Sequence, residues 1–234
     1  MNPLNFRVMK KKIGWSLLFI VLLIGALISY LFKFRYDVSR VSTGRQIEKT
    51  ATPKAALLVI DIQECTTGKT SNFKSYKLAS DSLIKTVNSI IRLSVCNNIP
   101  VVYIRNEVSD YLINLLDDSM EKGSEGTEID HRLLVVSDHI FKKEKQDAFS
   151  NPELDQFMIK NKVNELYITG LDAANCVNST ILAARNRGYL IRVIDEGIIA
   201  DKKETKEKMI KEFAQNGITI LSLAEFQEKL VNCP

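Results

Sequence analysis

The chain has 234 residues, which is enough for one ordinary α/β domain and a short additional segment. Its net charge of +4 is unevenly distributed, because residues 1–50 hold nine of the 32 Lys and Arg residues and two of the 28 Asp and Glu residues. The rest of the chain is slightly acidic and has no basic stripe interleaved with aromatic residues. Nucleic-acid binding needs clustered Lys and Arg, so the composition argues against nucleic acid as a partner.

The first expected element is a membrane-spanning helix at residues 13–32. This run of 20 residues carries no charge, and a helix rising about 1.5 Å per residue would cross the ~30 Å hydrocarbon layer. Trp15 and Tyr30 lie near its ends, where aromatic rings favour the headgroup region. A cleaved signal peptide is the alternative, but the run exceeds the usual length of about 7–15 residues and no small-x-small motif follows. We therefore expect a single-pass membrane protein that contacts lipid through these residues.

The orientation of this helix is almost balanced by charge. Four basic residues precede it and four follow it, namely Arg7, Lys10, Lys11 and Lys12, then Lys33, Arg35, Arg40 and Arg45. The densely basic tail at residues 1–12, with its free amino group, favours a cytoplasmic tail and a main domain on the extracytoplasmic side. Residues 33–54 are polar, contain Pro53 and lack periodicity, which predicts a stalk or linker before a folded domain at residues 55–234.

After Pro53, short apolar β-rich runs alternate with helical patterns. The expected strands cover residues 55–61, 99–105, 139–141, 165–170, 189–195 and 218–221. An apolar stripe from Tyr76 to Ile91 predicts the first helix of this domain, and further helices are expected at about residues 151–160, 175–187 and 203–215. Gly188 and Gly217 follow two of these helices, where a left-handed residue is common.

This alternation predicts an α/β fold, a three-layer α/β/α sandwich with a doubly wound, mostly parallel, six-stranded sheet. The nearly continuous apolar runs "ALLVID" and "ELYIT" are typical of parallel strands that are covered on both faces. In such folds, sites form outside the carboxyl ends of the strands. Residues 107–138 are rich in Asp, Ser, Glu and Gly and predict a long surface loop with a short helix, a kind of segment that is commonly functional.

The cysteines give no sign of a structural metal site. They lie far apart, form no CxxC pair and are accompanied only by two histidines, the positions being Cys65, Cys96, Cys176, Cys233, His131 and His139. A domain of this size does not need a disulfide framework. Cys65 follows Asp61 by four residues and could lie at the mouth of a shared pocket, although a packing role is the simpler interpretation. The histidines are interpreted as surface or strand-edge residues, and Cys96 and Cys233 receive no role.

Three reactive side chains lie at or beyond predicted strand ends. Asp61 closes the first strand, Lys143 follows the third, and Cys176 comes six residues after Gly170. A cysteine at a helix start is close to unpaired N–H groups and the helix dipole, which can lower its pKa. A carboxylate can take the thiol proton and an ammonium can stabilise the anion. Each residue alone has a common structural interpretation, as a cap, a surface lysine or a core cysteine.

The segments "ALLVIDIQE" and "FKKEKQDAFSNPELDQFM" resemble motifs of the isochorismatase-like cysteine hydrolases, a superfamily of isochorismatases, nicotinamidases and N-carbamoyl amidases. "ALLVIDIQE" is similar to the family's strand ending in Asp-x-Gln, which assigns Asp61 as the acid/base and Gln63 as its neighbour. "FKKEKQDAFSNPELDQFM" is similar to the family's lysine followed by Ala-Phe and a helix start. By its spacing to Phe149 the family lysine falls on Lys143, with Lys142 and Lys145 as close alternatives.

The third segment, "ELYITGLDAANCVNSTILAARNRGYLIRVIDEG", resembles the series of strand, Gly, Cys-Val, helix, Gly-Tyr, strand and Asp that identifies the superfamily. The spacing from Gly170 to Cys176, with Val177 directly after, is the most specific signal in the chain. The resemblance implies that Cys176 attacks a carbonyl or related carbon, Asp61 shuttles the proton and Lys143 stabilises charge. A thioester or similar intermediate would then be hydrolysed.

The resemblance also implies an oxyanion site made by backbone N–H groups at the nucleophile and at a non-proline cis peptide, expected here between Asp172 and Ala173. Ala173 replaces a frequent Thr of the family. The expected substrate- and oxyanion-contacting residues are therefore Asp172, Ala173, Gln63 and Phe149. No metal or cofactor is expected, because no His lies between Asp61 and His131, whereas nicotinamidases carry metal-binding His residues there.

Three functions stay open at this point. The first is a membrane-anchored cysteine hydrolase acting on an amide, carbamoyl or related bond of a small molecule. The sequence leaves open that such an enzyme forms a homo-oligomer. The second is a catalytically inactive domain of the same fold that binds or scaffolds at the membrane. The third is a thiol redox protein in which Cys176 pairs with Cys65, which requires the two sulfur atoms to come within disulfide reach.

Overall fold

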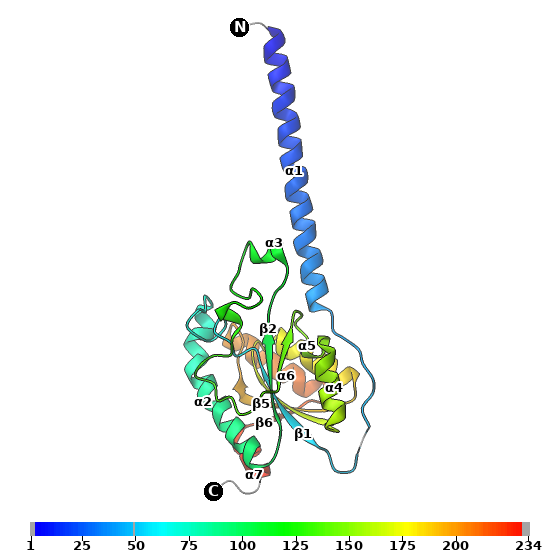
Figure 1. Cartoon of the computed structure of the whole chain (residues 1–234), viewed down its shortest axis with the longest axis vertical. Helices are drawn as coiled ribbons and strands as arrows, with labels where there is room; N and C mark the ends of the chain where they lie inside the picture. The colour runs from blue at the N-terminus through cyan, green and yellow to red at the C-terminus, as the bar shows by residue number, and fades with distance from the viewer. Residues whose placement is uncertain (1–2, 49, 231–234) are drawn as a thin grey trace. The chain divides into compact units, whose positions relative to one another are not determined.

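The computed structural model describes residues 3–48 and 50–230, with side chains from residue 15 onward, and the chain divides into two compact units, Met1–Val38 and Ser39–Pro234. The first unit is the helix α1 (Pro3–Ser39), the long blue helix of Figure 1. Its segment Trp15–Ser39 is long and apolar enough to cross a membrane by length and composition. The helix runs past residue 32 into the expected stalk, because neither Gly nor Pro interrupts residues 26–43.

The second unit is built on a six-stranded sheet. Its strands are β1 (Ala55–Ile60), β2 (Val101–Asn106), β3 (Ile140–Lys143), β4 (Glu165–Gly170), β5 (Leu190–Ile198) and β6 (Thr219–Leu221). They are ordered β3-β2-β1-β4-β5-β6, and every neighbouring pair is parallel. The predicted doubly wound sheet is confirmed, and it is parallel throughout rather than mostly parallel.

Helices cover both faces of this sheet (Figure 1). They are α2 (Lys74–Cys96), α3 (Tyr111–Asn114), α4 (Pro152–Lys160), α5 (Cys176–Asn186), α6 (Lys203–Gln215) and α7 (Leu223–Lys229), with 3-10 turns at Glu125–Thr127 and Ala148–Ser150. Residues of α4, α5 and α6 share one buried apolar cluster with the sheet, and residues of α2 and α7 share the other. The expected three-layer sandwich is therefore present.

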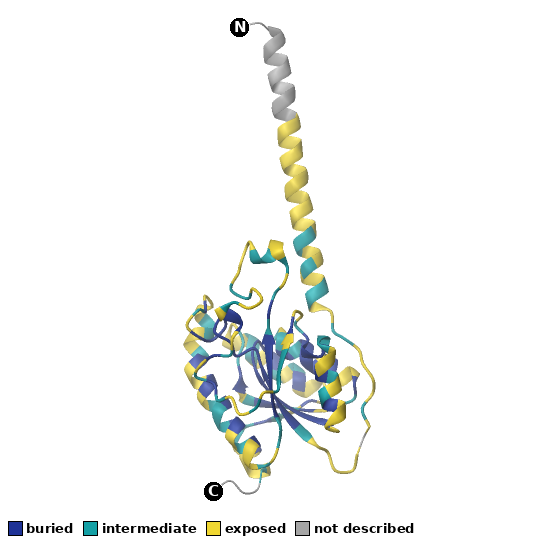
Figure 2. Cartoon of the chain, in the orientation of Figure 1, coloured by how far each residue is buried: buried dark blue, intermediate teal, exposed yellow. Residues whose placement is uncertain are grey.

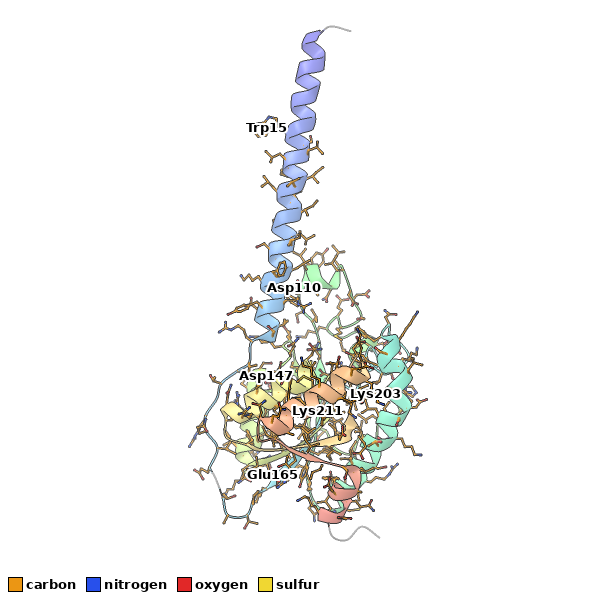
Figure 3. The ribbon with its side chains drawn as sticks, turned by 180° about the vertical axis from the view of Figure 1, so that it is seen from behind. Trp15, Asp110, Asp147, Glu165, Lys203 and Lys211 are labelled. Atoms are coloured by element: carbon orange, nitrogen blue, oxygen red, sulfur yellow. The ribbon has the colours of Figure 1, made fainter. Side chains whose placement is uncertain are left out.

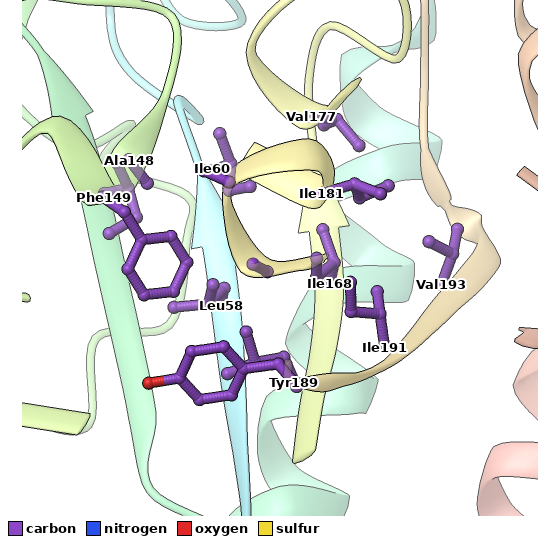
Figure 4. Close-up of a cluster of buried hydrophobic side chains, with 14 of the residues drawn as sticks. Leu58, Ile60, Ala148, Phe149, Ile168, Val177, Ile181, Tyr189, Ile191 and Val193 are labelled. Carbon is purple, nitrogen blue, oxygen red and sulfur yellow. The ribbon is translucent and has the colours of Figure 1, made fainter. Parts of the chain in front are cut away.

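The alternation of side chains along β1 supplies both cores. Ala56, Leu58 and Ile60 join the cluster of α4, α5 and α6, whereas Leu57 and Val59 join the cluster of α2 and α7. Figure 4 shows the first of these clusters, and Figure 2 shows the strands as the buried centre of the domain. A strand that is buried on both faces needs the continuous apolar run that the sequence shows.

The strand order places a topological switch between β1 and β4. From β1 the chain moves outward to β2 and β3, and it then returns to β4 on the other side of β1. Loops that leave β1 and β4 thus diverge, which leaves room for a site at their carboxyl ends. Gly170 ends β4 with a φ of +114°, and a Cβ atom there would collide with the carbonyl oxygen of Ile60. Only glycine fits this close approach.

Residues 42–48 and 50–54 are attached to the rest of the second unit by hydrogen bonds. The backbone N–H of Ser42 donates to Asp147 Oδ2 at 2.8 Å, that of Ile47 to the Arg187 carbonyl at 2.9 Å, and that of Lys54 to Asn164 Oδ1 at 2.7 Å. The buried Arg187 also donates to the carbonyl of Ser42 at 3.3 Å. The segment expected as a stalk is therefore attached to the domain at several points.

We predict that Gly170→Ala lowers the free energy of unfolding by roughly 2–4 kcal/mol, because it combines an unfavourable φ with a steric collision. Gly217→Ala is the matched control, since Gly217 also has a positive φ of +79° but nothing within 4 Å of an added Cβ. That control should cost only about 1 kcal/mol. Unfolding of the whole chain followed by circular dichroism compares them, and equal losses would contradict the close approach.

Candidate active site

The strand register brings the three predicted reactive residues together. Asn106 of β2 pairs with Lys143 of β3, and Ile60 of β1 pairs with Gly170 of β4, so the following loops meet at one edge. Lys143 Nζ lies 2.9 Å from Asp61 Oδ2 and 3.3 Å from Cys176 Sγ. Residues that are 82 and 33 positions away from Lys143 along the chain are thus its direct contacts.

Asn106 is a fourth member of the cluster, which the sequence analysis missed. Its Oδ1 accepts a hydrogen bond from Lys143 Nζ at 3.3 Å, and its Nδ2 contacts Met120 Sδ at 3.2 Å. An ammonium group has three N–H donors, and Asp61, Cys176 and Asn106 provide one acceptor each. The sequence did offer one signal for Asn106. It is a polar residue at the end of strand β2, just as Asp61 directly follows the end of strand β1.

The backbone around Asp61 turns its carboxylate toward Lys143. Asp61 has a φ of +55°, its N–H donates to the Ile104 carbonyl at 3.0 Å, and its own carbonyl accepts from Thr66 Oγ1 at 2.7 Å. These bonds hold a conformation that is uncommon for a residue other than glycine. Oδ1 is buried and has no hydrogen-bond partner among the residues that the structure describes. This oxygen is free to accept a proton.

The thiol of Cys176 is held in its neutral form. Burial, followed by the negative charge of Asp61, raises its pKa, and the opposing effect of Lys143 is smaller. The expected lowering by the helix start does not dominate, because the sulfur is removed from water beside a carboxylate. Burial by itself lowers the pKa of Lys143, but the charge of Asp61 and the hydrogen bonds to Asp61 and Cys176 outweigh it and raise that pKa. The cluster therefore holds a neutral thiol beside an ammonium group.

The cis peptide bond lies one residue earlier than expected, between Leu171 and Asp172. The N–H of Ala173 donates to the Ile199 carbonyl at 2.9 Å and is therefore occupied, which removes Ala173 as an oxyanion donor. In the described part of the chain, the backbone N–H groups of Asp172 and Cys176 have no acceptor. These two groups are the candidate donors to an oxyanion.

The side chain of Asp172 fixes the loop in front of Cys176. Its Oδ2 accepts from Tyr76 Oη at 3.0 Å and from the N–H of Asp201 at 2.8 Å. Its Oδ1 accepts from the N–H of Ala174 at 2.8 Å and from Asn175 Nδ2 at 2.9 Å. With four donors on its two oxygens, this carboxylate acts as a positioning group. The contribution of Asp172 to a candidate oxyanion site is therefore its backbone N–H.

The side chains of Gln63 and Phe149 also have structural roles. The amide of Gln63 is fully buried, where Nε2 donates to the carbonyls of Asn106 and Thr127, both at 2.9 Å, and Oε1 accepts from the N–H of Asn106 at 2.7 Å. Phe149 lies in the apolar core, with its ring 5.5 Å from that of Tyr189 (Figure 4). The 3-10 turn Ala148–Ser150 points this ring inward, so the structure does not bring Phe149 to the reacting atoms.

Cys65 is fully buried, and burial followed by the charge of Asp61 raises its pKa to about 12. Both Cys65 and Cys176 are free thiols, so nothing supports the redox pair that the sequence left open. Cys96, by contrast, is disulfide-bonded.

Among the described residues, the one group of potential metal ligands is Glu64, Asp130 and His131. His131 Nδ1 lies 2.8 Å from Glu64 Oε1. Both oxygens of Asp130 accept from Arg132, at 3.0 Å and 2.7 Å, so a guanidinium already supplies positive charge there. His139 packs against the ring of Phe157 at 4.6 Å, as expected for a residue at a strand edge.

Comparisons with known proteins show the family of this chain. The model of the isochorismatase domain matches residues 55–225. The chain belongs to the isochorismatase family. It is an isochorismatase-like hydrolase, and no curated protein matches it by sequence.

Several solved structures share the fold. An isochorismatase-like hydrolase from Alkaliphilus metalliredigens superposes with a TM-score of 0.66 at 19% identity, covering 75% of this chain and 98% of that one. N-carbamoylsarcosine amidase from Thermoplasma acidophilum gives 0.62 at 23% identity, covering 74% and 98%. Nicotinamidase/pyrazinamidase from Bacillus subtilis gives 0.62 at 20% identity, covering 71% and 98%. At these identities the likeness establishes the family fold and leaves the substrate open.

We predict that Asn106→Asp slows alkylation of Cys176 by iodoacetamide about tenfold at pH 8, because a second carboxylate beside Lys143 raises the thiol pKa by about one unit. Asn216→Asp adds the same charge at an exposed position just past α6 and should leave the rate unchanged. Mass spectrometry of the Cys176 peptide measures both rates. An unchanged alkylation rate in Asn106→Asp would show that position 106 does not influence the thiol of Cys176.

Proposed function

We propose that this chain is a membrane-anchored cysteine hydrolase that cleaves an amide, carbamoyl or related C–N or C–O bond of a small molecule through Cys176, Asp61 and Lys143. The observation that carries this proposal is the buried ammonium of Lys143 in contact with both Asp61 Oδ2 and Cys176 Sγ. Two structures with the same fold are named as an N-carbamoylsarcosine amidase and a nicotinamidase, which supports carbamoyl and amide substrates.

The chemistry follows from the protonation states of the three groups. As Sγ forms a bond to the substrate carbonyl carbon, Asp61 Oδ1 takes the thiol proton. The carbonyl oxygen becomes an oxyanion, which the N–H groups of Cys176 and Asp172 can hold. Protonated Asp61 then gives its proton to the leaving group, and the C–N or C–O bond breaks to leave a thioester. Water activated by Asp61 hydrolyses the thioester and restores the thiol.

Lys143 keeps this proton transfer favourable. Two negative charges, on Asp61 and on the sulfur, compete in the same desolvated space, and the ammonium lies within hydrogen-bond distance of both. It therefore stabilises whichever of the two is ionised as the proton moves. No metal is required for this sequence of steps.

We further propose that α1 anchors the enzyme and that its catalytic domain lies on the extracytoplasmic side. The uncharged run at residues 13–32 supports the anchor, and the basic tail that precedes it supports a cytoplasmic N-terminus. The disulfide at Cys96 supports the external side for the domain, since disulfides persist in oxidising compartments.

The first test separates the roles of Asp61 and Lys143. Asp61 raises the pKa of the Cys176 thiol and Lys143 lowers it, so Asp61→Asn should speed alkylation by iodoacetamide and Lys143→Met should slow it, each about tenfold. Both variants should lose about 10²–10⁴-fold in hydrolysis of a panel of small amides and carbamoyl compounds, because proton transfer is impaired. The double variant keeps the buried pair neutral and controls for misfolding in Lys143→Met.

Cys176→Ser completes this test as the variant without a thiol, and it should give neither alkylation at this site nor turnover. If the unmodified chain hydrolyses nothing in the panel while its Cys176 shows no response to either charge change, the domain is a binding or scaffolding module. Alkylation that responds to both changes supports the proposed cluster.

A second test addresses the side of the membrane. In protein taken from its own membranes and denatured under alkylating conditions, the Cys96 peptide should be modified only after reduction, since its sulfur is bonded in the native chain. Cys65 and Cys176 should be modified without reduction, which provides an internal control. A Cys96 peptide that is fully alkylated before reduction would place the domain in a reducing compartment.

A further inference from the structure

The loop between β2 and β3 carries an exposed apolar patch. Its members are Tyr111, Leu112, Leu115 and Leu116, whose exposed fractions are 77%, 43%, 71% and 63%. Their spacing places them on one side of a helical turn formed by α3 and the two residues after it. Adjacent exposed apolar side chains of this size mark an interaction surface.

This patch is presented by an ordered turn. Asp110 Oδ1 accepts hydrogen bonds from the N–H groups of Leu112 at 3.0 Å and Ile113 at 3.1 Å, which caps α3. Asn114 Nδ2 donates to the Val108 carbonyl at 3.1 Å and ties the other end of the turn to the start of the loop. The apolar side chains therefore stand outward on a fixed backbone.

The patch lies at the same edge of the domain as the candidate active site. It follows β2, whose last residue Asn106 contacts Lys143. The hydrogen bond from Ser42 to Asp147, the first that attaches the segment after α1, is at this edge too, because Asp147 comes just after the end of β3. Figure 3 shows Asp110 and Asp147 toward one end of the domain and Glu165, the first residue of β4, toward the other.

The chain between the apolar run and Ser42 is short. Residues 33–39 are helical and rise about 10 Å, and the three residues from Ser39 to Ser42 reach at most about 10 Å. If residues 13–32 span the hydrocarbon layer, Ser42 lies within about 20 Å of its boundary. Since Ser42 is bonded to the domain, the active-site edge is confined near the membrane surface.

We propose that the patch of Tyr111, Leu112, Leu115 and Leu116 inserts into the interfacial layer of the bilayer that holds α1, so that the active-site edge faces lipid headgroups. This inference rests on the membrane anchor proposed above. Leucine side chains gain from burial at the acyl boundary, and tyrosine favours the headgroup level.

A second exposed group at this edge fits the same partner. Phe73 and Leu78, at the start of α2, are exposed at 39% and 89% and flank the exposed Lys74 and Lys77. Apolar side chains beside lysines suit a surface of phosphate headgroups above acyl chains. Asp117 and Asp118 follow the patch and would be repelled by a strongly anionic membrane, so the surface that fits is zwitterionic.

The test uses the full chain in nanodiscs of phosphatidylcholine, one chain per disc, with bromine on the acyl chains as a short-range quencher. Trp15 is the only tryptophan and is removed as Trp15→Phe. Leu115→Trp then reports on the patch. Leu190→Trp is the matched control, because Leu190 is 53% exposed and begins β5 at the opposite edge, paired with Glu165.

We expect brominated lipid to quench Leu115→Trp at least about twofold more strongly than Leu190→Trp, with a blue-shifted emission only in the former. Equal quenching of the two variants in discs that contain the chain would contradict insertion of the patch. It would not contradict membrane anchoring by α1. A blue shift without quenching would show that protein covers the patch, which also overturns the proposal. A chain that does not enter discs would overturn the anchor and this inference together. Alkylation of Cys176 in each variant checks independently that the hydrolase site is intact.

Discussion

The buried ammonium of Lys143 is the constraint on which the site depends. A cation removed from water is costly unless charge and hydrogen bonds compensate it. Lys143 is 3% exposed, and its three donors meet Asp61, Asn106 and Cys176, which come from three different segments. The ends of β1, β2 and β3 and the start of α5 must therefore keep their relative positions. The same contacts that stabilise the lysine place the thiol of Cys176 beside an ammonium group.

The residues around this cluster serve mainly to hold it. Gln63 joins the loop after β1 to the end of β2, and Asp172 joins the loop before Cys176 to Tyr76 and Asp201. Their polar atoms are used within the protein, so their loops are fixed before a substrate arrives. In the proposed mechanism, the thiol of Cys176 becomes a nucleophile when its proton moves to Asp61.

The segment that follows α1 also contacts residues that support the Lys143 cluster. Ser42 donates to Asp147, which lies on the loop after Lys143, and Arg187 donates to the Ser42 carbonyl while lying 4.8 Å over the ring of Phe149. Arg187 also makes a close ion pair with Asp155 of α4. The segment leaving α1 is thus bonded to groups that support the lysine loop. The segment after α1 and the lysine loop therefore share these contacts.

Local patterns in the sequence determined the alternation of strands and helices, the long apolar N-terminal helix, and the reactive residue types at strand ends. Apolar runs report burial on both faces, and strand ends in a parallel sheet meet at one edge, so Asp61, Lys143 and Cys176 could be named together. The tertiary structure alone decided that Asn106 completes the lysine's contacts and that Phe149 turns into the core. It also placed the cis bond at Leu171–Asp172 and attached Ser42 and Lys54 to the domain by hydrogen bonds. These features depend on which segments pack against one another and how much water they exclude. Neither property can be predicted from a local run of residues. The protonation of Cys176 follows the same rule, since burial beside Asp61 outweighs the helix start that its sequence position suggested.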